Sequence, residues 1–353
     1  MCVNTFTKCL VVIASTAILS GCGSGSSSSP GPTVVTEANL VSDTAGAAHT
    51  DTNLVNGWGI SYGPTGPFWV SSNGAGKSTI YDGTGATVIP AVNIPAAGGG
   101  SNGPVTGQVF NGTTGFLMPG TATKSVFIFV NEDGIVSSWA GGASATMVAD
   151  RSSTGAVYKG VAIGQTTGGA PLLLAANFNS GKIDVFDTSF TFLRSTTDPF
   201  LPTGYAPFGI QTIGGTVFVT LAKQDVDQHD DVAGPGNGFV DEFTTDGTFV
   251  RRLISGGDLN SPWGLVQAPT GFGSFGGALL VGNFGDGTIH AYRISSGSEM
   301  GTLMSSTGGP VDIPGLWGLI FGNGGSAGLT GTLYFSAGPG GESHGLFGSL
   351  TPQ

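Results

Sequence analysis

The sequence predicts an all-β fold, and composition provides the first two observations for it. Gly contributes 64 and Pro 19 of the 353 residues. Because Gly and Pro cost about 1 and 3 kcal/mol in a helix interior relative to Ala, such a chain favours turns and short strands. The hydrophobic share is 39%, with 22 Phe, while only 9% of residues are charged. This balance is typical of a packed core and not of a disordered chain.

The third observation is a short apolar segment with an internal Gly that occurs six times. The segments are GWGIS, TGQVF, KGVAI, FGIQT, WGLVQ and WGLIF, around Gly59, Gly107, Gly160, Gly209, Gly264 and Gly318. The spacing between successive anchor glycines is 48 to 55 residues. One repeat of this length corresponds to one four-stranded blade, so the sequence predicts a six-bladed β-propeller.

The remaining strands of each repeat follow the anchor in order. Second strands are expected at 67–73, 125–131, 171–178, 216–223, 278–284 and 332–338. Third strands are expected in STIYDG, GIVSSWAG, GKIDVFD, GFVDEFTTDG, GTIHAYR and HGLFGSL. Fourth strands are expected at 87–95, 145–150, 191–197, 248–255 and 301–306. Apolar and polar residues alternate along many of these segments, as in strands with two differently packed faces.

The sixth repeat has no fourth strand of its own. Residues 34–43 precede the first anchor and belong to no repeat. We expect this N-terminal strand to complete the last blade and close the ring, which removes two exposed strand edges. A stack of parallel β-solenoid coils is the rival architecture, but its coils are shorter and leave no spare strand.

The N-terminus indicates export and lipid attachment. An apolar segment after Lys8 is too short to span a bilayer and is typical of a signal peptide. It ends in Leu19-Ser20-Gly21-Cys22, which resembles the bacterial lipobox. The resemblance implies a signal peptide over 1–21, a lipid such as palmitate on Cys22, and a Gly/Ser/Pro tether over 22–33 before a propeller domain over 34–353. Gly23, in place of Asp, favours the outer membrane.

Charge and cysteine usage exclude two kinds of chemistry. The formal charge is −11, and no basic stripe is present to neutralise phosphates, so nucleic-acid binding is not expected. All three Cys lie within the first 22 residues, so the domain after the tether has no disulfide and no thiol chemistry.

One loop on the expected ligand-binding face concentrates the acids of this weakly charged chain. The loop between the second and third strands of repeat four is long and contains Asp225, Asp227, His229, Asp230 and Asp231. With Asp241, Glu242 and Asp246 nearby, it accounts for seven of the 22 acids. Such ligands suit Ca²⁺ or another divalent metal, although the spacing is not that of an EF-hand. The alternative interpretation is a solvated acidic loop.

Two further polar groups are expected on the same face. His49, Asp51 and Asn53 precede the first anchor, and Glu342 with His344 lies in the last loop. A His beside a carboxylate can act as a base, a metal ligand or a ligand-binding pair, and the alternative is turn capping. His290 is expected to be structural. Trp58, Trp263 and Trp317 occupy equivalent positions with Phe208, which indicates packing between blades.

Several segments resemble a family of exported bacterial propeller proteins. They include NLVNGWGISYGPTGPFWVSSNG, AANFNSGKIDVFD, AKQDVDQHDDVAGPGNGFVDEF, GALLVGNFGDG and ESHGLFGS. The resemblance extends from about Asn39 to Gly348, and the anchors resemble NHL-type repeats more loosely. Members of that family often carry a PEP-CTERM sorting tail, whereas this chain has a lipobox. The resemblance implies the propeller fold and no particular activity.

Two functions follow from these features. The preferred one is a lipid-anchored binding or scaffold protein of the bacterial cell envelope, which presents its loop face to a carbohydrate, a peptide or a partner protein. It is preferred because no complete catalytic constellation appears. The alternative is a metal-dependent hydrolase or lyase with an ion held over the central channel by loop residues.

Overall fold

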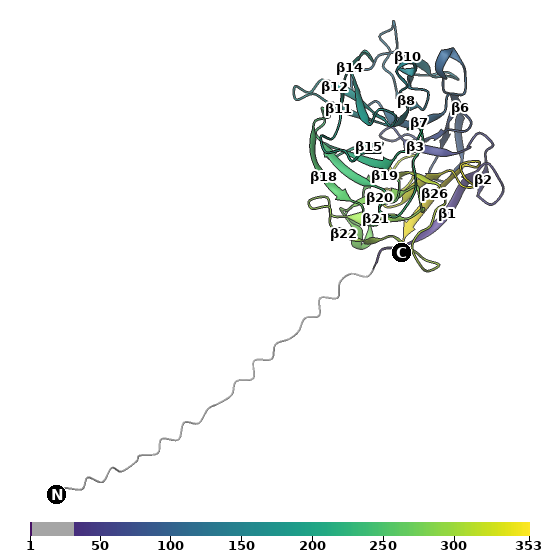
Figure 1. The fold of residues 1–353 in the computed structure, drawn as a ribbon. Helices are drawn as coiled ribbons and strands as arrows, with labels where there is room; N and C mark the ends of the chain where they lie inside the picture. The colour runs from purple at the N-terminus through teal and green to yellow at the C-terminus, as the bar shows by residue number, and fades with distance from the viewer. Residues whose placement is uncertain (2–31) are drawn as a thin grey trace. The chain divides into compact units, whose positions relative to one another are not determined.

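Five four-stranded antiparallel sheets and one larger sheet form the six blades. The computed structural model describes Met1 and residues 32–353, and Pro32–Gln353 forms one compact unit. The signal peptide, Cys22 and most of the tether lie outside the described residues. Within each of the five four-stranded blades the strands follow one another in chain order, which is the propeller arrangement that the repeats predict (Figure 1).

The first three blades contain β3 to β14. Blade one comprises β3 (Gly57–Ser61), β4 (Phe68–Ser72), β5 (Lys77–Tyr81) and β6 (Thr87–Asn93). Blade two comprises β7 (Val105–Phe110), β8 (Phe127–Asn131), β9 (Ile135–Trp139) and β10 (Thr146–Asp150). Blade three comprises β11 (Tyr158–Gln165), β12 (Pro171–Asn177), β13 (Lys182–Phe186) and β14 (Phe192–Thr196). Single 3₁₀ turns lie at η1 (Ala97–Gly99) and η2 (Ser152–Thr154).

The last three blades contain the remaining strands. Blade four comprises β15 (Tyr205–Ile213), β16 (Thr216–Lys223), β17 (Phe239–Phe243) and β18 (Phe249–Ser255). Blade five comprises β19 (Pro262–Gln267), β20 (Leu279–Asn283), β21 (Ile289–Tyr292) and β22 (Glu299–Thr302), with the 3₁₀ turn η3 (Gly273–Phe275). Blade six comprises β24 (Leu316–Phe321), β25 (Leu333–Ala337), β26 (Leu346–Pro352), β1 (Val34–Ser42) and β2 (His49–Thr50).

The N-terminal strand closes the ring as the sequence predicts. β1 pairs antiparallel with β26, from Val35 opposite Pro352 to Ser42 opposite Leu346, and Figure 1 shows the purple and yellow ends of the chain side by side. Two details differ from expectation. The strand expected at 301–306 ends at Thr302, and β23 (Met304–Ser305) instead pairs parallel with β1. β2 adds a short outermost strand parallel to β1.

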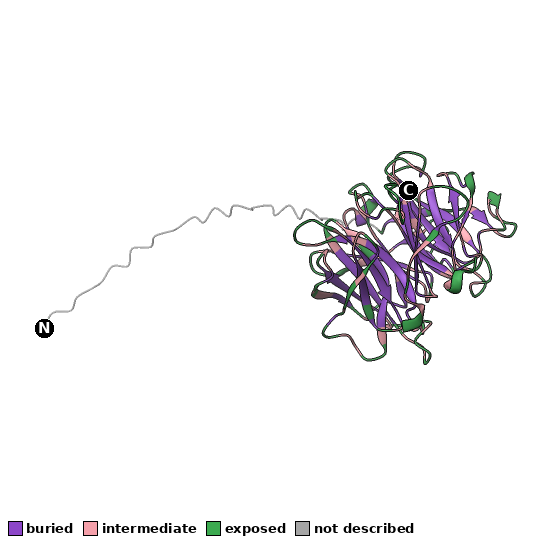
Figure 2. Cartoon of the chain, turned by 90° about the horizontal axis from the view of Figure 1, so that it is seen from above, coloured by how far each residue is buried: buried purple, intermediate pink, exposed green. Residues whose placement is uncertain are grey.

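Alternating side chains divide the core into one layer per blade interface. On β12, Leu172 and Leu174 pack toward blade four, whereas Leu173 and Ala175 pack toward blade two. Six such clusters lie between successive blades, and Figure 2 shows the buried strands in purple with exposed loops in green. A seventh, aromatic cluster lies at the centre and joins residues of five blades.

The anchor glycines let the inner strands approach each other around the channel. A Cβ added at Gly59 would lie 2.7 Å from Thr106 O, and one at Gly209 would lie 2.1 Å from Trp263 O. The other four anchors, Gly107, Gly160, Gly264 and Gly318, face the inner strand of the next blade in the same way, at 2.6 to 3.0 Å. The repeated Gly is therefore required by backbone contact between blades and not by turn conformation.

Candidate functional site

One end of the central channel is covered by two sets of loops, those after each second strand and those leading into each inner strand. The channel below is narrow: the space between its lining residues, which include Gln108, Val161 and Leu265, amounts to about 30 Å³. This is room for very few water molecules. A ligand of this face must therefore bind at the channel mouth, which we define as the region around Lys159, Glu132, His229, Asp230 and Glu342.

A ring of six side chains, one from each blade, surrounds the channel below the mouth. These are the residues directly before the six anchor glycines: Trp58, Thr106, Lys159, Phe208, Trp263 and Trp317. Trp58 stacks on Trp317 at a centroid distance of 3.6 Å, and Trp263 contacts both rings edge-on. Phe284 stacks on the Trp317 ring at 4.1 Å. The predicted packing role of these tryptophans is confirmed, since they close the channel with an aromatic plug.

Lys159 is the one charged member of this ring, and its side chain is 1% exposed. Its ammonium forms ion pairs with Glu132 and with Asp230, the latter at 3.1 Å between Nζ and Oδ1. The same group lies 5.1 Å from the centroid of the Trp58 ring, within cation–π range. Burial lowers the pKa of Lys159, but the two carboxylates more than offset this and raise the pKa above its usual value. The side chain is therefore an ammonium at neutral pH.

Asparagine side chains hold the acids of the mouth in place. Asn73 Nδ2 donates to Glu132 Oε2 at 2.8 Å, and Asn56 Nδ2 donates to Glu342 Oε2 at 2.6 Å. Asn56 in turn accepts a hydrogen bond from Trp317 Nε1 at 3.2 Å, so the plug and the mouth are connected. Burial, reinforced by the charges of Glu132 and Asp230, raises the pKa of Glu342.

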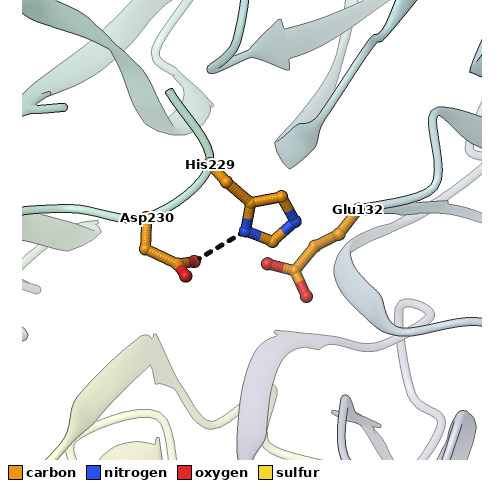
Figure 3. Close-up of side chains that lie close together, drawn as sticks. All are labelled: Glu132, His229 and Asp230. Carbon is orange, nitrogen blue, oxygen red and sulfur yellow. Dashed lines mark hydrogen bonds and ion pairs between the residues drawn. The ribbon is translucent and has the colours of Figure 1, made fainter. Parts of the chain in front are cut away.

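The acidic loop brings a histidine to the mouth. His229 Nδ1 lies 3.0 Å from Asp230 Oδ1, and the two side chains are 46% and 66% exposed. His229, Asp230 and Glu132 each offer one ligand atom within 4.8 Å of the others. Figure 3 shows these three side chains close together. Asp225 shapes the loop, because its Oδ1 accepts from the backbone N–H of His229 at 2.9 Å.

The other acids of this loop lie differently. Asp227 is exposed, at the outer part of the loop. Burial raises the pKa of Asp231. The charge of Lys159 lowers this pKa and the charge of Asp230 raises it, so Asp231 lies beside the mouth. Of the five predicted metal ligands, the structure therefore brings His229 and Asp230 to a common point with Glu132, and Asp231 close to it.

The remaining predicted ligand-binding residues lie apart from that point. His49 is on β2, the outermost strand of blade six, and is exposed. Asp51 accepts from the hydroxyl of Tyr81 at 2.8 Å and from the backbone N–H of Asn53 at 2.9 Å. Asn53 accepts from Lys77 Nζ at 2.6 Å. These contacts anchor the loop before β3.

His344 forms a separate pair with Asp43. Its Nδ1 lies 2.9 Å from Asp43 Oδ2, and its side chain is 47% exposed. Although burial raises the pKa of Asp43, hydrogen bonds from His344 and from the Gly345 N–H outweigh it and lower that pKa. Of the last-loop pair, Glu342 therefore belongs to the mouth, whereas His344 bonds to Asp43.

Backbone strain concentrates around the mouth. Seven non-glycine residues have positive φ in the part of the chain that the structure describes. Five of them are in the loops and strand starts of this face: Asn56 (52°), Asn102 (66°), Gln228 (57°), Ser261 (48°) and Glu342 (66°). Strained residues of this kind persist where the surroundings fix them and are common at functional sites.

Sequence reasoning missed Glu132, Lys159, Asn56 and Asn73. A signal for Lys159 was present, because it is the only charged residue directly before any anchor glycine. Glu132 and Asn73 carry no comparable signal, since each lies in a short ordinary turn and acquires its role only when the ring closes.

The mouth is not the largest hollow of the protein. A hollow of about 580 Å³ lies beside Asp82, Leu329 and Tyr334, and another of about 570 Å³ lies against Thr114–Thr121 and Thr188–Phe190 and is lined by no ionisable side chain. We assign more weight to the mouth, where charge, burial and strain coincide. Among the described residues, no helix has the length and apolar character needed to cross a membrane.

Solved structures confirm the propeller fold. The chain is similar to the soluble aldose sugar dehydrogenase of Escherichia coli, with a TM-score of 0.56, 13% identity, and coverage of 91% of this chain and 100% of that one. It is similar to a streptogramin B lyase, with a TM-score of 0.53, 11% identity, and coverage of 91% and 98%. At these identities the likeness extends to the fold alone.

Sequence comparison provides the family. No protein-family model matches the chain. The uncharacterised protein R648 of Acanthamoeba polyphaga mimivirus is 35% identical over 288 residues, covering 77% of this chain and 70% of that protein. The uncharacterised protein L690 of the same virus is 33% identical over 330 residues, covering 86% and 82%. The bacterial origin and the export implied by the resemblance above stay predictions. The chain belongs to the same family of six-bladed β-propellers as these two mimivirus proteins.

Proposed function

We propose that this protein is a binding protein that takes its ligand at the channel mouth. The observation that supports this most strongly is the convergence of side chains from all six blades around one buried lysine. They are Asn73, Glu132, Lys159, Asp230, Trp263 and Glu342, in blade order. Trp263 contributes through a 3.0 Å hydrogen bond from Nε1 to the Lys159 carbonyl. Only the closed ring brings these positions together, and such convergent polar groups are typical of ligand sites.

An unsatisfied polar atom supports a ligand at the same place. Trp58 Nε1 is buried and has no hydrogen-bond partner within residues 32–353, and the centroid of the Trp58 ring lies 5.1 Å from the Lys159 ammonium. A buried polar group without a partner costs about 1–3 kcal/mol, so native proteins rarely retain one without a reason. A bound ligand or its ordered water provides such a partner.

A panel of compounds tests this proposal by thermal shift. The panel contains envelope oligosaccharides, short peptides and divalent metal salts, added one at a time to the full chain. Asp230→Asn removes the exposed charge of the mouth, and Asp227→Asn makes the same change on the exposed outer part of the same loop. We expect at least one compound to raise the Tm of the wild type and of Asp227→Asn, with a much smaller rise in Asp230→Asn.

The opposite pattern contradicts the proposal. If every stabilising compound acts equally on Asp230→Asn and Asp227→Asn, the ligand binds elsewhere. If no compound of any class shifts the wild-type Tm, a scaffold role that uses only the outer loops becomes the better description.

We also propose that a lipid on Cys22 attaches this domain to the bacterial cell envelope, at the outer membrane. The lipobox-like Leu19-Ser20-Gly21-Cys22 supports this anchor, and its partner is then the membrane itself. In bacterial expression, radiolabelled palmitate should enter the wild type and Cys9→Ser but not Cys22→Ser. Label in Cys22→Ser, or none in the wild type, would contradict lipidation at this residue.

A metal-dependent hydrolase or lyase stays the alternative. Enzymes occur among the similar structures, but likeness at 11–13% identity concerns the fold and does not favour catalysis here.

A further inference from the structure

We propose that the channel mouth binds a divalent transition-metal ion of the Zn²⁺ class through Glu132, His229 and Asp230. The inference rests on the proposed ligand site at the mouth and identifies the chemical class of its ligand. It differs from the prediction from sequence, in which Glu132 was not among the candidate ligands.

Geometry provides the first argument. One ligand atom of each of the three side chains lies within 4.8 Å of the other two. Ligands about 2.0–2.1 Å from a tetrahedral zinc lie roughly 3.3 Å from each other, so the most widely separated pair needs to approach by at most about 1.5 Å. The half-exposed side chains of His229 and Asp230, on a surface loop, can make this small movement.

The ion pairs of Lys159 use only one oxygen of each carboxylate. Its ammonium contacts Glu132 Oε1 and Asp230 Oδ1 from the buried side. Asp230 Oδ2 and His229 Nε2 have no hydrogen-bond partner within residues 32–353, and Glu132 Oε2 keeps a second lone pair beside its bond from Asn73. Each carboxylate therefore keeps one oxygen that Lys159 does not contact.

Charge provides the second argument. Glu132, Asp230, Asp231 and Glu342 bring four carboxyl groups to the mouth, and Lys159 brings one ammonium. Such an excess of negative groups in a partly buried site attracts a cation. A divalent ion offsets most of the excess.

A buried polar atom without a partner is the independent second observation. Trp58 is 2% exposed, and its Nε1 has no acceptor in the described part of the chain, although the Lys159 ammonium lies over its ring. A metal ion brings its own water ligands, which can both donate to a carboxylate and accept from an indole N–H.

The mixture of ligands indicates the class of ion. Ca²⁺ and Mg²⁺ are bound by oxygen atoms, whereas an imidazole together with carboxylates suits Zn²⁺ and its neighbours in the first transition series. Asp258, His290 and Glu299 form a second possible group in residues 32–353. There, the His290 ring is 6% exposed and both nitrogens already face Thr288, Thr302 or Glu299, so this group is a weaker candidate.

Calorimetric titration of the chelator-stripped full chain with ZnCl₂ tests the proposal, with CaCl₂ and MgCl₂ as comparison salts. We expect one equivalent of Zn²⁺ to bind and neither comparison salt to compete at equal concentration. His229→Ala and Glu132→Gln should each weaken Zn²⁺ binding at least tenfold. His344→Ala is the matched control, because His344 has nearly the same exposure and also pairs with an Asp. It should leave the affinity within twofold of wild type.

Four outcomes would overturn the proposal: no heat with Zn²⁺, unchanged affinity in His229→Ala, equal loss in His344→Ala, or selective loss in His290→Ala. Glu132→Gln removes a partner of buried Lys159, so the folding of this variant is checked by near-UV circular dichroism. If Glu132→Gln is unfolded, His229→Ala decides the result. If Zn²⁺ fails to bind while the compound panel still shows loss in Asp230→Asn, only the metal inference falls. If Zn²⁺ binds but raises the Tm of Asp230→Asn and Asp227→Asn by the same amount, the proposed binding site itself is wrong.

Discussion

At the residue scale, the central feature is a lysine where other blades place an aromatic ring. Trp58, Trp263 and Trp317 fill the equivalent positions in blades one, five and six, and they form the plug. An ammonium at such a buried position is stable only when carboxylates compensate it, and Glu132 and Asp230 do so from neighbouring blades. Lys159 thus belongs to the ring itself, whereas its two carboxylate partners come from loops of the neighbouring blades.

Replacement of this lysine should destabilise the fold. Lys159→Met leaves the mostly buried Glu132 without its counter-charge, and we expect a loss of about 3 kcal/mol in the free energy of unfolding. Lys182→Met, at an exposed strand start, should change it by less than about 0.5 kcal/mol. Urea denaturation measures both. Equal, small effects in the two variants would show that the ion pairs contribute little.

A buried carboxyl in blade four predicts a pH dependence of stability. Burial, opposed by Arg252 and reinforced by Asp198, raises the pKa of Asp241 from 3.8 to about 6. Because the folded state then binds the proton more tightly than the unfolded state, this stabilisation is present below pH 3.8 and is lost as the pH rises through 6.

The Asp241→Asn variant isolates this contribution. Between about pH 5 and pH 7 the wild type should lose about 1 kcal/mol more unfolding free energy than Asp241→Asn, as measured by urea denaturation at each pH. The comparison uses the difference in slope, because removal of the Arg252 partner lowers the stability of the variant at every pH. Parallel pH profiles would contradict the raised pKa.

At the element scale, the inner strands approach so closely that only glycine fits at the anchors. Sequence repetition located these six positions, but the reason for them became visible only in the ring, where each anchor faces the backbone of the next blade. Gly209 has the closest approach of the six, since a Cβ added there would lie 2.1 Å from Trp263 O. The close spacing of the blades thus depends on glycine at these positions, because a Cβ atom would collide with the backbone of the next blade.

A pair of alanine substitutions tests this dependence. Gly209→Ala should cost about 3 kcal/mol, because the rigid backbone of blade five must move. Gly331→Ala places the same methyl group where no atom lies within 4 Å, so it should be close to neutral. Thermal and urea unfolding give the two values. A neutral Gly209→Ala would show that the inner strands can separate at little cost.

At the scale of the whole molecule, β1 makes the ring continuous. Val35 and Val41 of this strand are fully buried, in the cores on either side of blade six. Val41→Asp should therefore reduce stability by at least about 3 kcal/mol. Val250→Asp, at an exposed strand position, should be tolerated. A stable Val41→Asp, judged by urea denaturation, would mean that the ring does not depend on this strand.

The sequence predicted the fold well because repetition, glycine spacing and strand alternation are local signals. Six blades and closure by residues 34–43 are confirmed, whereas β2 and β23 were missed because strands of two residues have no periodicity to detect. The site was predicted in part. His229, Asp230 and Glu342 were selected from loop composition, but Glu132 and Lys159 are about 70 to 100 residues away from Asp230 and meet it only through ring closure.

The central claim is that ligand binds at the channel mouth, and hydrogen–deuterium exchange tests it most directly. The full chain is compared with and without the panel compound that stabilises it most. Slower exchange should occur in residues 132–134, 228–231 and 338–344, which carry Glu132, Asp230 and Glu342. The loop over residues 117–124, which lies outside the mouth, should be unchanged. Protection confined to that loop or to the outer strands, with no change at the mouth, would contradict the account.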